Sequence, residues 1–132
     1  MRILIADDHE VIRRTVIRIF QMRPDVECAE AENGREAVEK ALELKPDLVV
    51  LDIRMPDLGG LEAAKQIKRH LPEIPVLFFS VHDTDDILAQ AKSIGEGAII
   101  KDQAATVLLK AVDALLRKET FFPVECAAAG RT

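Results

Sequence analysis

The chain has 132 residues, of which 48% are hydrophobic and 31% charged, a composition typical of one globular domain with its own core. Its 23 acidic residues outnumber 18 basic ones and give a net charge of −5. Such a surface repels duplex DNA unless a basic patch overrides it, and no such patch stands out, so we expect no direct nucleic-acid binding by this chain. No apolar run approaches the ~20 residues of a membrane span, and the apolar start is too short for a signal peptide. We therefore expect a cytoplasmic protein that does not enter a membrane.

The two cysteines, Cys28 and Cys126, are too far apart in the sequence to suggest a joint role. Neither belongs to a Cys-x-x-Cys or Cys/His pattern, so a zinc site is not expected. Cys28 lies in a strand-like run, where we expect it to be a small buried hydrophobic residue.

Short apolar runs alternate with helical patterns from one end of the chain to the other. The helical patterns carry apolar residues three or four positions apart, as an amphipathic helix requires. Asn33 is a candidate N-cap, and Pro46 should end the helix that Asn33 begins. The strand-like runs are 2–6, 26–31, 47–52, 74–79 and 98–100, and the helical patterns cover 11–22, 33–45, 61–71, 84–94 and 102–116.

This alternation predicts an α/β fold with one doubly wound, five-stranded parallel sheet and helices on both faces. The continuous aliphatic run at 47–52 suits a central strand that is covered on both faces. The strand order 2-1-3-4-5, that of flavodoxin-like folds, is the natural one for five such units. We expect the folded domain to span 1–118, with 119–132 as a C-terminal tail or the start of a linker, in which Phe121 and Phe122 are candidates for packing back on the body.

Polar side chains follow the predicted strands at their carboxyl ends, where ligands bind in such sheets. Asp7 and Asp8 follow the first strand, Asp52 ends the third, Ser80 follows the fourth and Lys101 follows the fifth. Each has an ordinary interpretation by itself: an aspartate that caps a helix, a turn serine, a solvated lysine. Together those interpretations fail, because three carboxylates within a few Å repel one another and raise one another's pKa. A divalent cation relieves the repulsion, and oxygen-only ligands favour Mg²⁺ over zinc.

With Mg²⁺ present, such a site contains the parts that phosphoryl transfer needs, which are positioning groups and positive charge near the transferred oxygens. With these residues at its strand ends, the chain resembles the receiver domain of bacterial two-component response regulators. The matching stretches are Ile3–His9 and Leu51–Pro56, together with Ser80 and Lys101. The opening Ala-Asp-Asp-His and the late Phe-Pro are similar to receivers that precede a LuxR-type helix-turn-helix domain.

The resemblance implies a role for each strand-end residue. Asp52 would accept a phosphoryl group from the phosphohistidine of a sensor histidine kinase, in a phosphorelay. Asp7, Asp8 and Asp52 would hold Mg²⁺ together with the backbone carbonyl of Arg54. Lys101 and Ser80 would bind the phosphoryl oxygens. On this interpretation the chain is no enzyme in the ordinary sense, because it would catalyse only its own phosphorylation and dephosphorylation.

The resemblance also implies a switch in which phosphorylation shifts the population of two arrangements. The altered face would bind a partner or form a homodimer. Transcription would be regulated through a helix-turn-helix output domain that this chain does not contain. Arg54 and His82 follow the phosphoacceptor and the serine by two positions, and we expect them to tune the lifetime of the phosphoryl group; the alternative is that both are merely exposed loop residues.

The chain departs from the usual receiver pattern at three places. Ala98 stands where many receivers have an aromatic residue, Asp102 stands where they have proline, and Gly59-Gly60 replaces Asp-Gly, which we expect to loosen that loop. Two rival functions are weaker. A partner-binding scaffold without phosphorylation should lack the acidic pair or the acceptor. A nucleotide-binding flavodoxin-like enzyme should have a glycine-rich phosphate loop after the first strand.

Overall fold

The computed structural model describes residues 1–80, 85–101 and 104–122. His82, Asp102 and Cys126 lie outside these residues, so what the sequence predicts for them stays a prediction. In the described part of the chain, strands and helices alternate throughout. They are β1 (Arg2–Ala6), α1 (Glu10–Phe20), β2 (Glu27–Ala31), α2 (Gly34–Leu44), β3 (Leu48–Asp52), α3 (Gly60–His70), β4 (Val76–Ser80), α4 (Asp85–Ile94), β5 (Gly97–Ile100) and α5 (Ala104–Leu116).

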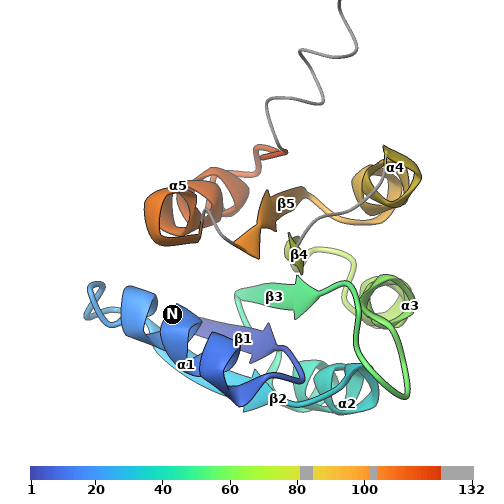
Figure 1. The fold of residues 1–132 in the computed structure, drawn as a ribbon, viewed down its shortest axis with the longest axis horizontal. Coiled ribbons are helices and arrows are strands. Elements are labelled where there is room, and N and C mark those ends of the chain that lie inside the picture. The colour runs from blue at the N-terminus through green and yellow to red at the C-terminus, as the bar shows by residue number, and fades with distance from the viewer. Residues whose placement is uncertain (81–84, 102–103, 123–132) are drawn as a thin grey trace, which may run out of the picture.

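The five strands form one parallel sheet in the order β2-β1-β3-β4-β5, which confirms the predicted fold class and strand order. Helices α1 and α5 cover one face of the sheet, and α2, α3 and α4 cover the other (Figure 1). The chain therefore changes winding direction between β1 and β3, and the crevice for a ligand lies beyond the carboxyl ends of these two strands.

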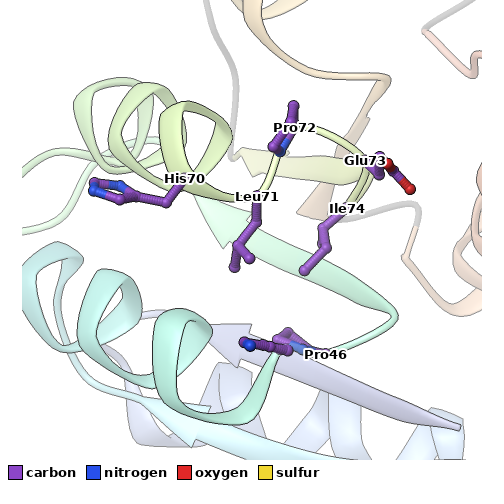
Figure 2. Close-up of a pocket in the computed structure, with 7 residues that line it drawn as sticks. Pro46, His70, Leu71, Pro72, Glu73 and Ile74 are labelled. Atoms are coloured by element: carbon purple, nitrogen blue, oxygen red, sulfur yellow. The ribbon is translucent and has the colours of Figure 1, made fainter.

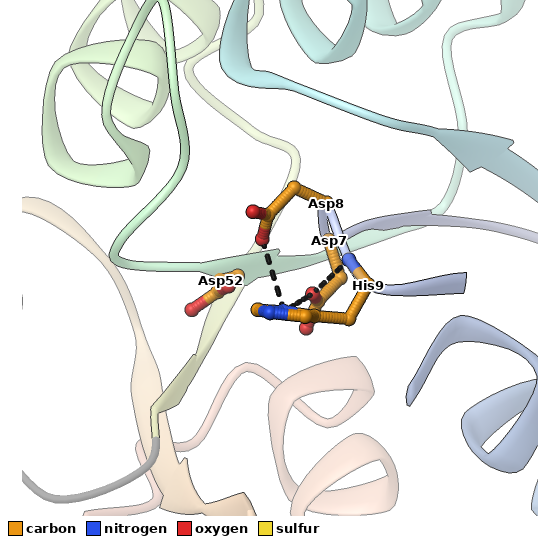
Figure 3. Close-up of side chains that lie close together, drawn as sticks. All are labelled: Asp7, Asp8, His9 and Asp52. Carbon is orange, nitrogen blue, oxygen red and sulfur yellow. Dashed lines mark hydrogen bonds and ion pairs between the residues drawn. The ribbon is translucent and has the colours of Figure 1, made fainter. Parts of the chain in front are cut away.

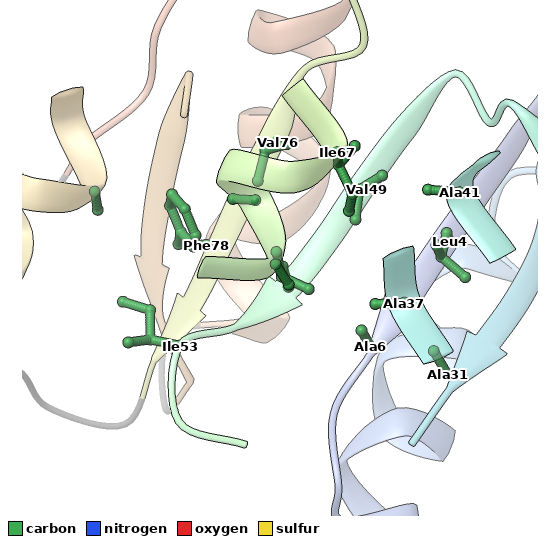
Figure 4. Packing of buried hydrophobic residues seen from close by; sticks show 14 of the residues in the cluster. Leu4, Ala6, Ala31, Ala37, Ala41, Val49, Ile53, Ile67, Val76 and Phe78 are labelled. Carbon is green, nitrogen blue, oxygen red and sulfur yellow. The ribbon is translucent and has the colours of Figure 1, made fainter. Parts of the chain in front are cut away.

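Alternating side chains along each strand supply two separate cores. Ile3 and Ile5 of β1 point to the core shared with α1 and α5, whereas Leu4 and Ala6 point to the core shared with α2, α3 and α4. The second core, shown in Figure 4, contains many alanines. All five residues of β3 are buried, so β3 is the doubly covered central strand that its aliphatic sequence predicts.

The boundaries of α2 confirm the two predicted helix signals. The side chain of Asn33 accepts a hydrogen bond of 2.8 Å from the backbone N–H of Glu36, which is the N-cap arrangement. Lys45 ends the helix in the left-handed conformation, with φ 48°, and Pro46 follows as a residue that cannot continue it.

Phe121 and Phe122 pack against the body of the domain beside β5. Phe121 pairs with Gly97 in a parallel bridge: its N–H donates to Glu96 O (3.1 Å), and its carbonyl accepts from the N–H of Ala98 (2.8 Å). Phe121 and Phe122 pack against the two different cores, so the prediction that these residues return to the body is confirmed.

One expectation needs correction. Cys28 is only partly buried, although it packs against the core beneath α1 and α5. Arg13 of α1, to which the sequence argument assigned no role, is 7% exposed. None of the helices in the described part of the chain has the length and apolar character that a membrane span requires.

Candidate functional site

The alternation of the strands brings three charged side chains to one face at the carboxyl edge of the sheet. Asp7 continues the row of Ile3 and Ile5, Asp52 continues that of Leu48 and Val50, and Lys101 lies two positions beyond Ile99; these apolar residues all belong to the core under α1 and α5. Because side chains alternate with a period of two, the three charges share the side of the sheet on which that core lies. The parallel register of β1, β3, β4 and β5 places their ends together.

These three residues form a buried cluster of charge. Lys101 Nζ lies 2.8 Å from Asp7 Oδ2 and 3.2 Å from Asp52 Oδ2. The side chains are 1% exposed at Asp7, 5% at Asp52 and 10% at Lys101. Two carboxylates therefore share one ammonium in a place where water screens little.

Burial and crowding raise the pKa of Asp52 to about 6, from an ordinary value of 3.8. Desolvation is the largest cause and the negative charge of Asp7 comes next; Lys101 and the backbone N–H of Arg54 act in the opposite direction without cancelling them. The sequence argument anticipated a raised pKa from repulsion between carboxylates, whereas the larger contribution comes from burial.

Lys101 remains a cation in this environment. Burial by itself would lower its pKa, but the interactions with the carboxylates of Asp7 and Asp52 outweigh burial and raise it. The ammonium also lies 5.6 Å from the centre of the Phe79 ring, within the range of a cation–π contact.

Asp8 and His9 complete the open side of the cluster (Figure 3). Ligand atoms of Asp7, Asp8, His9 and Asp52 all lie within 4.8 Å of one another. The sequence argument named the three aspartates but assigned no role to His9. Its place directly after the acidic pair was the available signal.

The other predicted site residues lie around this cluster. The backbone N–H of Arg54 donates to Asp52 Oδ1 (3.2 Å), which places the main chain of Arg54 against the Asp52 carboxylate. Ser80 is buried at the end of β4, one residue beyond Phe79, which pairs with Asp52. His82 lies outside the described residues.

Arg13 binds the main chain of Asp7 and links it to Glu30 of β2. Its guanidinium donates to the backbone carbonyl of Asp7 (2.7 Å) and to Glu30 Oε1 (2.9 Å). Lys40 of α2 in turn donates to the carbonyl of Glu30. The signal for Arg13 was its helical phase, because it falls on the same buried face of α1 as Val16 and Phe20.

Gly60 fixes the loop that follows Asp52. A Cβ atom at Gly60 would lie 2.0 Å from the carbonyl oxygen of Asp52, whereas one at Gly59 would find its nearest neighbour at 3.7 Å. The N–H of Gly60 also donates to Ile53 O (2.8 Å). Gly60 therefore allows the start of α3 to pack directly on the end of β3.

The residues present fit a hard divalent cation. Three carboxylates and one ammonium leave an excess of negative charge, and Asp7 Oδ2 is a buried oxygen that accepts no hydrogen bond among the described residues. This oxygen forms an ion pair with the Lys101 ammonium, 2.8 Å away. Carboxylate oxygens with coordination capacity to spare are the ligands that Mg²⁺ prefers.

Fold and site together define a doubly wound α/β protein with an acidic pocket beyond the carboxyl ends of β1 and β3. The comparison with known families identifies the protein further. Residues 3–113 match the family described as response regulator receiver domain. The chain belongs to this family, whose members act as signalling components of two-component systems.

Several of its relatives regulate transcription. The chain is 39% identical over 114 residues to the transcriptional regulatory protein LnrK of Bacillus subtilis, a match that covers 85% of this chain and 52% of LnrK. It is 35% identical over 114 residues to the transcriptional regulatory protein DegU of Brevibacillus brevis, covering 85% of this chain and 48% of DegU. The chain thus spans about half the length of these relatives.

Solved structures agree with the family assignment. A two-component response regulator of the LuxR family from Aurantimonas sp. matches with a TM-score of 0.86 and 29% identity, over 91% of this chain and 87% of that one. The isolated receiver domain of RcsB from Salmonella enterica, determined with the phosphomimetic BeF3⁻, matches with a TM-score of 0.84 and 26% identity, over 93% of each chain.

Proposed function

We propose that Asp52 is the phosphoacceptor of this receiver domain and takes its phosphoryl group from the phosphohistidine of a sensor histidine kinase. The observation that supports this most directly is the placement of the Asp52 carboxylate. It is buried at the carboxyl end of the central strand, beside a second carboxylate and an ammonium. A buried carboxylate with a perturbed pKa and a specific charged partner marks a functional site.

In this reaction an oxygen of the ionised Asp52 attacks the phosphorus atom. The P–N bond to the kinase histidine breaks, and its electrons stay with the departing imidazole. An acyl phosphate forms on Asp52. Because the pKa of Asp52 is about 6, most of the acceptor is ionised at neutral pH and available for attack.

Asp7, Asp8 and Asp52, with the backbone carbonyl of Arg54, would hold Mg²⁺, whose charge offsets that of the phosphoryl oxygens. Lys101 is already a cation beside the acceptor, so it can move its ion pair from Asp52 to the new phosphoryl oxygens. Ser80, buried at the neighbouring strand end, would donate its hydroxyl hydrogen to the same group.

The acyl phosphate carries about two negative charges where the ionised Asp52 carried one, and the added charge favours the arrangement in which Lys101 and Ser80 contact the phosphoryl group. Ser80 leads into α4 and Lys101 follows β5, so the face formed by β4, α4 and β5 would change. That face, or the face of α1 and α5, would then bind a partner or a second copy of the chain. With transcriptional regulators among the relatives, the output we propose is control of transcription through a helix-turn-helix domain.

Incubation with acetyl phosphate tests the proposal. With Mg²⁺, we expect the intact mass to rise by one phosphoryl group, and we expect no rise with EDTA. The variant Asp52→Asn should gain nothing. Asp57→Asn is the matched control, because Asp57 lies in the same loop but is about half exposed and pairs with Arg35 on the surface; it should gain the phosphoryl group as the wild type does. Phosphorylation of Asp52→Asn, or uptake without a divalent cation, would refute the proposal.

We further propose that the side chains of Arg54 and His82 set the lifetime of the acyl phosphate by crowding or guiding the hydrolytic water. Arg54 is exposed two positions after Asp52, so its side chain can reach the space above Asp52. Alanine at either position should change the rate of phosphoryl loss without preventing uptake. Unchanged decay in both variants would leave the residues as ordinary loop positions.

A further inference from the structure

His9 places a ring nitrogen on the open side of the acidic pocket. Its Nδ1 lies 3.2 Å from Asp7 Oδ1 and 3.2 Å from Asp8 Oδ1. The ammonium of Lys101 contacts the other oxygens, Oδ2 of Asp7 and Oδ2 of Asp52. The pocket therefore has two sides, one with a cation and one with an imidazole that lies over the carboxylates (Figure 3).

The backbone holds His9 in this place. Its N–H donates to Asp7 Oδ1 (2.9 Å), and its carbonyl accepts from the N–H of Arg13 as α1 begins (3.1 Å). His9 is the N-cap residue of α1, but its side chain makes no capping hydrogen bond. Its ring Nδ1 instead contacts Asp7 Oδ1 and Asp8 Oδ1, which belong to two of the carboxylates that would hold the ion, and replacing the ring removes no cap from the helix.

We propose that His9 is a nitrogen ligand of this pocket, so that the site binds imidazole-preferring transition-metal ions such as Co²⁺, Ni²⁺ or Zn²⁺ as well as Mg²⁺. The inference rests on the metal pocket of the proposed function and adds a fourth protein side chain to it. A separate observation is Asp7 Oδ2, a buried oxygen on the Lys101 side of the same pocket that accepts no hydrogen bond from the described residues and lies 2.8 Å from the ammonium, so that the Asp7 carboxylate keeps coordination capacity beyond this ion pair. One ligand atom from each of the four side chains lies within 4.8 Å of the others.

The chemistry of the ligands distinguishes the two kinds of ion. Carboxylate and carbonyl oxygens suit Mg²⁺, which loses its water reluctantly, whereas imidazole suits Ni²⁺, Zn²⁺ and their neighbours. A nitrogen in the ligand set therefore strengthens binding of the transition metals and does little for Mg²⁺. His9 becomes the residue that sets which divalent ion this receiver accepts.

Calorimetric titration of the full chain with Co²⁺ and, separately, with Mg²⁺ tests the inference. The variant His9→Ala should bind Co²⁺ at least about tenfold more weakly than the wild type, which is the scale of losses around metal sites. Its Mg²⁺ affinity should change by less than about twofold. His70→Ala is the matched control, because His70 is exposed at the end of α3 and its ring contacts only the backbone oxygen of Gln66 among the contacts described. A shift of the His9 ring nitrogen resonances on adding Zn²⁺ supplies a readout that does not depend on affinity.

Two results would overturn the inference: equal Co²⁺ affinity in wild type and His9→Ala, or equal losses for Co²⁺ and Mg²⁺, which would mean that His9 shapes the pocket without binding the ion. Acetyl phosphate separates this from the proposed function. If the wild type takes up phosphate with Mg²⁺ while His9→Ala keeps its Co²⁺ affinity, only the role of His9 fails. If His9 proves to bind Co²⁺ but Asp52 takes up no phosphate, the phosphoacceptor proposal fails instead.

Discussion

The two ends of the parallel strands differ in what they bury. At the amino ends of the strands, here called the amino edge, the turns before β3 and β4 leave a hollow of about 360 Å³, lined mainly by the apolar parts of the turn residues (Figure 2). Its charged residues, Lys45 and Glu73, are exposed. At the carboxyl edge, Asp7, Asp52 and Lys101 are buried against one another.

The difference shows that buried charge marks the functional edge better than the size of a hollow does. Exposed charges such as Lys45 remain solvated, and their place in the fold costs little. Two carboxylates and an ammonium in a buried site carry a desolvation cost that nothing in the packing of the sheet requires. Buried charges with this desolvation cost are typical of functional sites. Variants at the two edges should therefore behave differently.

The largest expected effect is that of Lys101→Met. This change leaves Asp7 and Asp52 buried without a counter-charge, and removing one partner of a buried ion pair costs about 3–5 kcal/mol. Urea denaturation at pH 7.5 in EDTA measures the loss. Lys110→Met on the exposed side of α5 is the control and should change stability by less than ~0.5 kcal/mol. Equal effects of the two variants would show that Lys101 balances no buried charge.

A somewhat smaller loss is expected for Gly60→Ala. The new Cβ would meet the backbone oxygen of Asp52 at 2.0 Å, so α3 or the end of β3 must shift, at a cost of about 3 kcal/mol. Gly59→Ser should stay within ~0.5 kcal/mol of the wild type, because the site is open, its φ is −68° and serine is a good N-cap. Thermal unfolding distinguishes the two. A tolerated Gly60→Ala would mean that the loop after Asp52 is loose, as the glycine pair alone suggests.

Asp52→Asn should raise the free energy of unfolding, whereas the two preceding variants lower it. The folded protein holds the proton of Asp52 up to a pKa of about 6, whereas the unfolded chain releases it near the ordinary value of 3.8. Stability therefore falls as the pH rises between about 4 and 6. At about 1.4 kcal/mol per pH unit, the ionised carboxylate costs on the order of 2–3 kcal/mol at pH 7.5.

Urea titrations of wild type and Asp52→Asn from pH 4 to pH 8, without divalent cations, measure this dependence. The gain in the variant should reach its full value above pH 6 and vanish near pH 4. Asp57→Asn, with its exposed carboxylate, should show no such gain. A gain that is the same at all pH values would show that the ionisation of Asp52 is not its cause.

Sequence periodicity was sufficient to predict the fold and most of the carboxyl edge. The rows Ile3-Ile5-Asp7 and Leu48-Val50-Asp52 alternate with a period of two, so the position of each charge follows once the strand order is known. Arg13 was missed because an arginine in an amphipathic helix is normally exposed. Its partners, the Asp7 carbonyl and Glu30, come from separate segments, and only the folded structure brings them together.

The role of His9 likewise could not be predicted from the sequence. The sequence places it next to the acidic pair, but the direction of its ring depends on how the chain turns from β1 into α1. The extended backbone of the N-cap residue (φ −99°, ψ 113°) and the hydrogen bond from its N–H to Asp7 set that direction. A pattern of residue types predicts which strand ends meet, whereas the ligand set follows from torsion angles that the pattern does not contain.

The smallest expected effect belongs to the amino edge. Ile74 lines the hollow there and is only partly buried against the core under α2, α3 and α4, so Ile74→Ala should cost about 1–2 kcal/mol, below the range for fully buried residues. Phosphoryl uptake from acetyl phosphate should proceed at the wild-type rate, because Asp52 and Lys101 lie at the other ends of the strands. Urea denaturation gives the cost and the rise in intact mass gives the rate. A slower uptake in fully folded Ile74→Ala would mean that the two edges are coupled through the sheet, and the amino edge would then be part of the switch.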